Sequence, residues 1–429
     1  MELSKLTVWQ GIVFTLLWAA YGSSYLLRKP LGVIKHDLQI SMNISNAHLG
    51  WLDTALLLPY AGVSLALGSI GDRLGPRRTL GMGLLVAAAA TVPMGSCYSL
   101  LPFLVLLAIS GAGQALCWPA ACTLLARWVS DKARNSAFGV FGTCCFVGGV
   151  GGTALSVTLL AQEGWRGVFI TPAIIVGTLA ILVLFLAFEP HERGLMIPGR
   201  VFESQQTKKV EPTQPAQVLS MIQVFRLPQV KEVSLAMFCV KAVRYALLFW
   251  LPLYLLRSLD YAQTQAGLAS TSFEIGGVVG SGLVGFIVDR IFQGRALLGC
   301  SVCIFGSGLA LIIFTATSFL GPPAHVLMLG LAGALNCGPD VVLAGSVAAG
   351  IGERAGGAAS AVTGFINGMG SLGTVLEGPL VAFASAHFGW GVLVPLMVGF
   401  SLIGAAASLR AHRLTRSPAE EQLPLVQPP

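Results

Sequence analysis

Two neighbouring cations, Arg28 and Lys29, end the first long apolar stretch of the chain, in the segment YGSSYLLRKPLG. A second arginine, Arg244, lies near the middle of a later apolar stretch, three residues after Lys241. A charge at the centre of a membrane helix costs about 3 kcal/mol on insertion scales unless it faces water or a partner. Guanidinium donors match the oxygens of phosphate, and a phosphomonoester carries about −1.5 to −2 charge at neutral pH. These cations therefore predict a site for a divalent oxyanion, with phosphate fitting best.

The residues before Arg28 support this interpretation. Tyr21, Tyr25 and Arg28 are spaced by four and three positions, so they share one helical face, and tyrosines suit a sugar or glycerol body. The alternative is that Arg28 only anchors the helix at the far membrane interface, because the 22 residues from Leu6 to Leu27 already span about 33 Å. The apolar LGVI after the cations and the central position of Arg244 both favour the anion site.

Acidic residues that could compensate these cations are few. The candidates are Asp53, Glu274, Asp340 and Glu377, and none shares an apolar stretch with Arg28 or Arg244. The last three could couple protons to the transport of another organic anion, such as a carboxylate. The favoured interpretation is that they form buried hydrogen bonds or pair with Lys241, with proton coupling as the alternative.

The elements that position these residues are membrane helices. Hydrophobic residues make up 55% of the 429 positions and charged residues 10%, whereas soluble proteins carry roughly 25% charge. Uncharged windows of about 20 residues, long enough to cross a bilayer, recur along the chain. We predict twelve, near 6–28, 49–71, 79–97, 100–126, 136–160, 167–188, 233–256, 266–288, 296–319, 324–350, 356–384 and 389–409.

The cysteines and the basic excess suggest no other class. The nine cysteines lie almost entirely in apolar runs and are expected to be packing residues, without disulfides. Cys300 and Cys303 have no second ligand pair, so no metal is expected. Of the 26 lysines and arginines, 19 fall in alternate loops and the termini. The positive-inside rule then places both termini in the cytoplasm and explains the formal charge of +7 without nucleic-acid binding.

The chain divides into two related halves. A polar stretch at 189–232 separates six predicted helices from six, and gives an N-terminal bundle at 1–188, a cytoplasmic linker, a C-terminal bundle at 233–410 and a tail at 411–429. Asp72 in GSIGDRLGPRR and Asp289 in GFIVDRIFQGR are 217 positions apart, and Arg28 and Arg244 are 216 apart. Matches at one offset indicate an internal duplication.

These residues also resemble a known family. The stretch GSIGDRLGPRR resembles the loop 2–3 signature of the major facilitator superfamily and is weakly repeated after the eighth helix. The resemblance implies an all-helical fold of two pseudo-symmetric six-helix bundles around a central cavity. The glycines permit close helix approach, and an aspartate can cap a neighbouring helix, which suits a gate. The residues assigned to gating are Gly68, Asp72, Arg73, Arg77, Asp289 and Arg290.

A closer resemblance is to the organophosphate:phosphate antiporters, specifically the sugar-phosphate exchanger branch. It rests on YxxxYxxRK at 21–29, GWLDTALLLPYAG at 50–62 and KAVRYALLFWLPLY at 241–254. In that family the helix 1 arginine binds phosphate, a role carried here to Arg28, and a helix 7 cation joins it. Ser64 and Cys145 depart from the bacterial members, where a lysine and a histidine stand. The residues assigned to substrate binding are Arg28, Lys29, Lys241, Arg244, Tyr21, Tyr25, Tyr245, Trp118 and Asn367.

The sequence therefore predicts a secondary transporter, not an enzyme, that exchanges a phosphorylated small molecule for inorganic phosphate as a monomer. Neither ATP nor a cofactor is expected, because no P-loop is present. The alternatives are a proton-coupled carrier of another organic anion and a phosphate sensor that does not transport. The exchanger resemblance implies the endoplasmic reticulum membrane ahead of the plasma membrane.

Overall fold

The computed structural model describes the chain apart from residues 1, 44–45, 68–69, 199–218, 262 and 415–429. The long helices of the first half are α1 (Glu2–Met42), α2 (Asn46–Leu67), α4 (Pro76–Thr91), α5 (Leu100–Ala115), α6 (Cys117–Trp128), α7 (Arg134–Gly167) and α8 (Ile170–Leu186). Those of the second half are α11 (Val230–Ser258), α12 (Gln263–Arg290), α13 (Ala296–Ala316), α14 (Pro322–Val342), α16 (Ala359–Phe388) and α17 (Leu393–Arg413). Three short helices, α3 (Ile70–Leu74), α10 (Met221–Arg226) and α15 (Ala348–Arg354), lie between them.

The length and composition of these helices fit a bilayer. Among the described residues, eight helical segments are long and apolar enough to cross a membrane, and two shorter apolar helices lie at Thr54–Leu67 and Ile170–Leu186. Between 39% and 61% of each spanning window is buried, so every span keeps a lipid-accessible face. The fold is thus all-helical and membrane-spanning, while the number of twelve spans and the cytoplasmic termini stay predictions.

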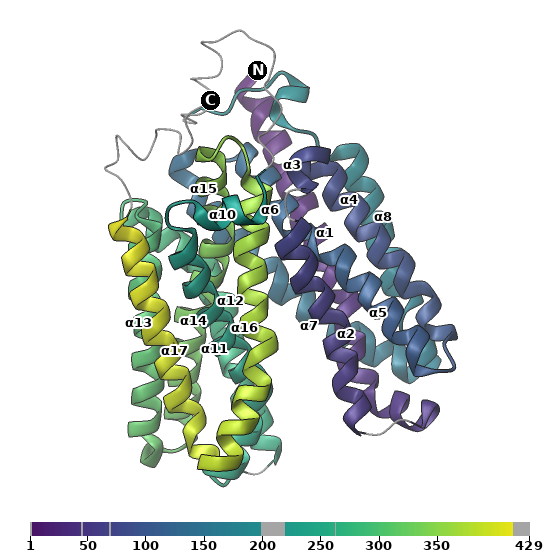
Figure 1. Cartoon of the computed structure of the whole chain (residues 1–429), viewed down its shortest axis with the longest axis vertical. Coiled ribbons are helices and arrows are strands. Elements are labelled where there is room, and N and C mark those ends of the chain that lie inside the picture. Colours follow the sequence, from purple (N-terminus) through teal and green to yellow (C-terminus); the bar gives the residue numbers. More distant parts are fainter. Residues whose placement is uncertain (1, 44–45, 68–69, 199–218, 262, 415–429) are drawn as a thin grey trace.

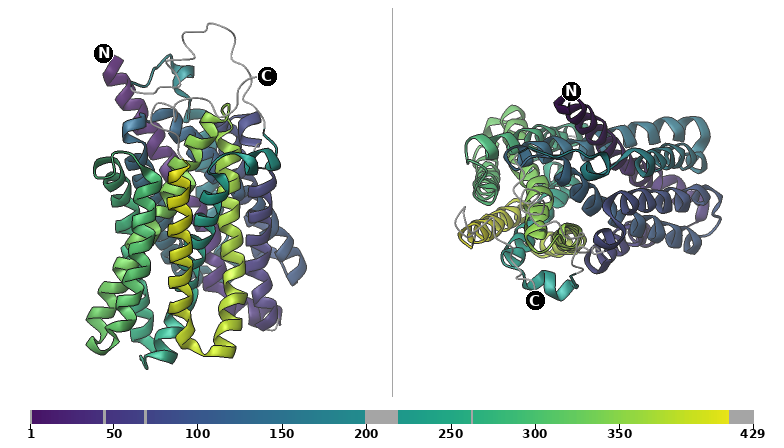
Figure 2. Two further views of the ribbon diagram at one scale, coloured as in Figure 1. Left: turned by 60° about the vertical axis from the view of Figure 1, so that its left-hand side comes forward. Right: turned by 90° about the horizontal axis from the view of Figure 1, so that it is seen from above.

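The helices form two groups that lie side by side (Figures 1 and 2). Helices α1 to α8 pack mainly on one another, as do α11 to α17, and the groups meet where α7 packs on α12 and α2 packs on α16. We call these groups the N bundle and the C bundle. The N-terminus, α3, α10 and α15 lie at one end of the molecule, which we call the terminal end (Figure 1).

Two helices that the sequence predicts to be regular each contain an irregular segment close to a proline. The predicted span at 100–126 is divided at Leu116, because Pro119 has no N–H to donate to the carbonyl of Ala115. In the related helix of the C bundle, Pro339 precedes a π-helical turn at Leu343–Val347. The indole Nε1 of Trp118 donates to the carbonyl of Ala344 at 3.1 Å. The two irregular segments therefore meet between the bundles.

Glycines set the closest helix approach in the C bundle. A Cβ atom at Gly276 would lie 1.8 Å from the carbonyl oxygen of Gly330, and one at Gly280 would lie 2.0 Å from that of Ala334. No side chain fits at such distances, so α12 and α14 pack backbone against backbone. This contact holds Asp340 of α14 in a fixed relation to α12.

Candidate functional site

A cavity lies between the two bundles, and eight of the nine residues assigned to substrate binding line it. Helices α1, α2, α6 and α7 supply one wall, and α11, α14, α16 and the π-helical turn η5 (Leu343–Val347) supply the other. The lining residues are Tyr21, Tyr25, Arg28, Leu57, Tyr60, Trp118, Cys145, Phe146, Lys241, Arg244, Tyr245, Asp340, Val341, Ala344, Asn367, Ser371 and Thr374.

Arg28 has only neutral partners among the described residues. Its Nε donates to the amide Oε1 of Gln114 at 2.5 Å, and its guanidinium lies 5.2 Å from the ring centre of Tyr25 and 4.8 Å from that of Tyr60. The rings favour the cation without neutralising it. The Nη2 atom of Arg28 is buried and has no hydrogen-bond partner in the described part of the chain. Arg28 therefore keeps both its charge and a free donor at the cavity.

Lys241 has a similarly neutral environment and links the bundles. Its Nζ donates to Oδ1 of Asn367 at 2.7 Å, and the Nδ2 of Asn367 donates to the hydroxyl of Tyr60 at 3.1 Å. Tyr60 belongs to α2 of the N bundle and lies under the guanidinium of Arg28. A continuous polar path thus joins Lys241 to the ring that holds Arg28.

Arg244 is arranged differently from Arg28. Its Nη1 pairs with Oδ2 of Asp340 at 2.5 Å, and its guanidinium lies 4.6 Å from the ring centre of Phe146 on α7. Both charged groups are largely buried, so the pair is compensated within the C bundle. Asp340, which the sequence assigns as a possible charge partner, pairs with Arg244.

Three other predicted residues lie outside the cavity lining. The side chain of Lys29 packs along Gly149 and Gly152 of α7, away from Arg28. Glu274 is exposed on α12, whereas Glu377 is 3% exposed on α16 and its Oε2 has no hydrogen-bond partner among the described residues. The described residues hold no cluster of three metal-ligating side chains.

Sequence reasoning missed Gln114 and Tyr60. Gln114 is fully buried, and its Nε2 donates to the hydroxyl of Ser110 at 3.1 Å, which in turn lies 3.5 Å from that of Thr91. The only signal in the sequence was a single amide in an otherwise apolar window. Tyr60 stands in the quoted segment GWLDTALLLPYAG, but its spacing gave no reason to place it near Arg28.

Two aspartates assigned to gating join the bundles at the terminal end. Asp72 accepts hydrogen bonds from the backbone N–H groups of Ser360 and Ala361, at 3.0 and 2.9 Å, where α16 begins. Asp289 accepts from the backbone N–H and the hydroxyl of Ser136, where α7 begins, and from the amide of Asn135. Each carboxylate thus satisfies free N–H groups at the start of a helix in the opposite bundle.

The environment of Asp72 shifts its titration. Burial raises the pKa of this carboxyl group to about 6, although the N–H groups of Ala361 and Ser360 and the nearby Arg127 act in the opposite direction. Asp72 lies on the short helix α3, outside the apolar spans. Desolvation is therefore the larger effect. The arrangement in which Asp72 contacts the start of α16, which we call the closed arrangement, holds the proton more tightly than water does.

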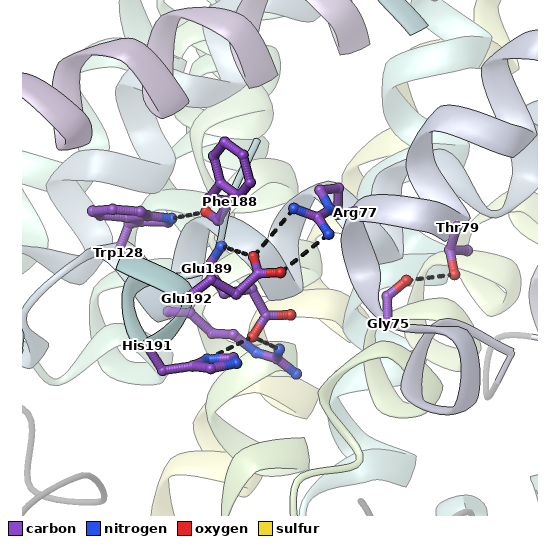
Figure 3. A network of polar contacts seen from close by, with 9 residues as sticks. Gly75, Arg77, Thr79, Trp128, Phe188, Glu189, His191 and Glu192 are labelled. Atoms are coloured by element: carbon purple, nitrogen blue, oxygen red, sulfur yellow. Dashed lines mark hydrogen bonds and ion pairs between the residues drawn. The ribbon is translucent and has the colours of Figure 1, made fainter. Parts of the chain in front are cut away.

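The other gating residues have separate surroundings. Arg77 forms a two-point ion pair with Glu192, at 3.1 and 3.2 Å, at the edge of the central linker (Figure 3). Glu189 of the same segment pairs with Arg127 and lies near His191 (Figure 3). Arg73 and Arg290 are exposed, and Gly68 lies outside the described residues. The first residues of the linker are thereby attached to the N bundle.

The sequence matches the Major Facilitator Superfamily over residues 17–359 and 233–428. The chain therefore belongs to this superfamily. Solved structures agree on the fold: a human organic anion transporter, MFSD10, superimposes with a TM-score of 0.67 at 15% identity, covering 93% of this chain and 99% of that one. The fucose:proton symporter FucP of E. coli gives 0.67 at 16% identity, covering 94% and 97%.

Relatives with named substrates cover nearly the whole chain. The glucose-6-phosphate exchanger SLC37A2 of Xenopus laevis is 26% identical, over 92% of this chain and 91% of its own length. The putative glycerol-3-phosphate transporter 5 of Arabidopsis thaliana is 27% identical, over 91% and 88%. The resemblance to the sugar-phosphate exchanger branch is confirmed at this modest identity.

Proposed function

We propose that this protein exchanges a phosphorylated small molecule, such as glucose 6-phosphate or glycerol 3-phosphate, for inorganic phosphate by alternating access. The observation that carries the proposal is the uncompensated charge of Arg28, which lines the cavity and whose buried Nη2 has no partner among the described residues, beside Lys241 with its neutral partner Asn367. The names of the relatives support a phosphorylated substrate. The rings of Tyr21, Tyr25 and Tyr245 would face its organic part.

Exchange, rather than one-way transport, follows from the charge of the empty site. The repulsion between two like charges grows about fourfold when the effective dielectric constant falls from about 80 in water to about 20 near protein. Closing the bundles around the empty site would remove the water that screens Arg28 and Lys241. A bound phosphate cancels this repulsion, so the loaded carrier reorients faster than the empty one.

The test uses proteoliposomes loaded with phosphate. We expect uptake of labelled glucose 6-phosphate or glycerol 3-phosphate to require internal phosphate. Arg28→Ala should reduce exchange by more than tenfold and Arg28→Lys by less, because a lysine keeps the charge but loses the paired donors. Arg413→Ala, at an exposed arginine near the end of α17, is the control and should behave as the unmodified protein. Release of preloaded phosphate at the same rate with and without an external substrate would refute exchange.

Glu377 favours one alternative function. Its buried carboxyl group, with Oε2 unpartnered in the described part of the chain, is suited to binding a proton, as a proton-coupled carrier of an organic carboxylate would require. An inward pH gradient that drives uptake without internal phosphate would favour this carrier. Dependence on internal phosphate at equal pH on both sides would favour exchange.

We further propose that the protein works as a monomer in the endoplasmic reticulum membrane, with both termini and the 189–232 linker in the cytoplasm. The composition of the loops supports the orientation, and the compartment rests on the resemblance to the sugar-phosphate exchanger branch. Protease protection of a tag at each terminus in microsomes would test the orientation.

A further inference from the structure

The two arginines that the internal repeat relates have opposite electrostatic surroundings. Arg244 pairs with the carboxylate of Asp340, whereas Arg28 donates its Nε to the neutral amide of Gln114. An ion pair cancels most of the field of an arginine, but an amide only orients it. Arg28 and Arg244, although related by the internal repeat, are therefore not equivalent ligand-binding groups.

Gln114 is itself held in one orientation. Its Nε2 donates to Ser110 Oγ at 3.1 Å, which leaves Oε1 to face Arg28. The hydroxyl of Thr91 donates to the carbonyl of Ala87 at 2.8 Å and lies 3.5 Å from Ser110 Oγ, so the polar chain ends on the backbone of α4. Gln114 is 0% exposed, so water does not compete for these bonds.

We propose that Gln114 is a positioning residue of the anion site, which fixes the guanidinium of Arg28 through Nε and leaves its charge uncompensated. Because Nε is occupied, only the terminal nitrogens of the fork remain to donate to a ligand, and the buried Nη2 has no partner among the described residues. The inference rests on the proposed function and refines it. It assigns the ligand-binding charge to Arg28, and not equally to Arg28 and Arg244.

The same geometry specifies the charge of the ligand. Arg28 and Lys241 have neutral partners in Gln114 and Asn367, while Arg244 and Asp340 cancel each other. The cavity thus keeps two positive charges, which match a phosphate dianion. A phosphodiester, which carries only one negative charge, should compete more weakly than a monoester of the same alcohol.

The test changes the charge of residue 114 without changing its size. Gln114→Glu places a carboxylate beside Arg28 and should raise the KM for phosphate by at least about tenfold. Gln114→Met removes the acceptor without adding charge, and a smaller rise in KM, with little change in the maximal rate, is expected. Phosphate self-exchange in proteoliposomes gives both quantities, and thermal unfolding in detergent checks that each variant is folded.

A double variant tests whether Gln114→Glu acts through its charge or through a change in packing. Asp340→Asn removes one negative charge from the cavity, so combining it with Gln114→Glu restores the original balance. We expect the double variant to bind phosphate more tightly than Gln114→Glu alone. If the two substitutions only disturbed packing independently, their effects on phosphate binding would instead add, and the double variant would bind more weakly than either single variant.

The outcomes distinguish the inference from the proposed function. An unmodified protein that exchanges phosphate, together with a Gln114→Glu variant of unchanged KM, would overturn the inference alone. A folded double variant weaker than both single variants would also overturn it. An unmodified protein that neither exchanges phosphate nor is stabilised by it would overturn both.

Discussion

At the scale of single residues, Tyr60 has two roles that substitution can separate. Its ring lies 4.8 Å from the guanidinium of Arg28, and its hydroxyl accepts a hydrogen bond from Asn367 across the bundle interface. Tyr60→Phe keeps the ring and should raise the KM for phosphate by less than about threefold. Tyr60→Leu removes the ring, and a cation–π contact of about 1–2 kcal/mol predicts a rise of about five- to thirtyfold.

Phosphate self-exchange measures both Tyr60 variants, and Arg413→Ala again serves as the control. Equal KM values for Tyr60→Phe and Tyr60→Leu would mean that the ring does not support Arg28.

Residue spacing predicted the cations of the site better than their partners. Arg28, Lys241 and Arg244 are recognisable because charges in apolar stretches are rare, and all three line the cavity. Lys29 has the same signature but packs on α7, since neighbouring helical residues point about 100° apart. Gln114 lies 86 positions after Arg28, and Tyr60 lies on the next long helix, α2. Only the packing of α1 against other helices identifies these two residues as partners of Arg28.

At the scale of elements, the contact between α12 and α14 should be sensitive to one methyl group. A Cβ atom at Gly280 would lie 2.0 Å from the carbonyl oxygen of Ala334, whereas one at Gly282 would lie 3.8 Å from its nearest neighbour, Thr143. We expect Gly280→Ala to be less stable than Gly282→Ala by about 1–3 kcal/mol, because only the first methyl group overpacks.

Thermal unfolding in detergent compares the two glycine variants on one helix. Because both gain the same helix propensity, their difference reports packing alone. Melting temperatures that agree within error would show that α12 and α14 can separate without cost.

The elements were more predictable than their irregularities. Hydropathy placed the long helices to within a few residues at most ends, yet α1 extends over Glu2–Met42, well beyond the predicted 6–28, because its polar end continues as helix past Pro30. The break at Leu116 and the π-helical turn at Leu343–Val347 were not predicted. Hydropathy indicates which segments are apolar enough to cross the bilayer, but it does not indicate where the hydrogen-bond pattern within a helix changes.

At the scale of the whole molecule, the terminal end should respond to pH through Asp72. Its pKa is about 6 in the closed arrangement and should return to about 3.9 when the bundles separate and water reaches it. The closed form therefore binds the proton more tightly, and protonation stabilises it. This contribution is fully present below about pH 4 and is lost as the pH rises through 6, with a span of about 3 kcal/mol.

Spin labels at Arg78 and Gln293, both exposed at the terminal end, would report this equilibrium. We expect the short-distance population to fall between pH 4 and 7 in the otherwise unmodified protein and to stay constant in Asp72→Asn. The same pH response in both proteins would assign the effect to another group.

The distance in sequence between Arg28 and Gln114 also affects how the chain is made. The two residues are 86 positions apart, so at about 5–20 residues per second α1 waits about 4–17 s before α5 is synthesised. During that time Arg28 lacks the acceptor that orients it in the folded protein and has only nearby residues such as Tyr25 for support. The nascent first helix should therefore stay close to the aqueous translocon channel, or to an insertase with a polar groove, until the fourth predicted span arrives.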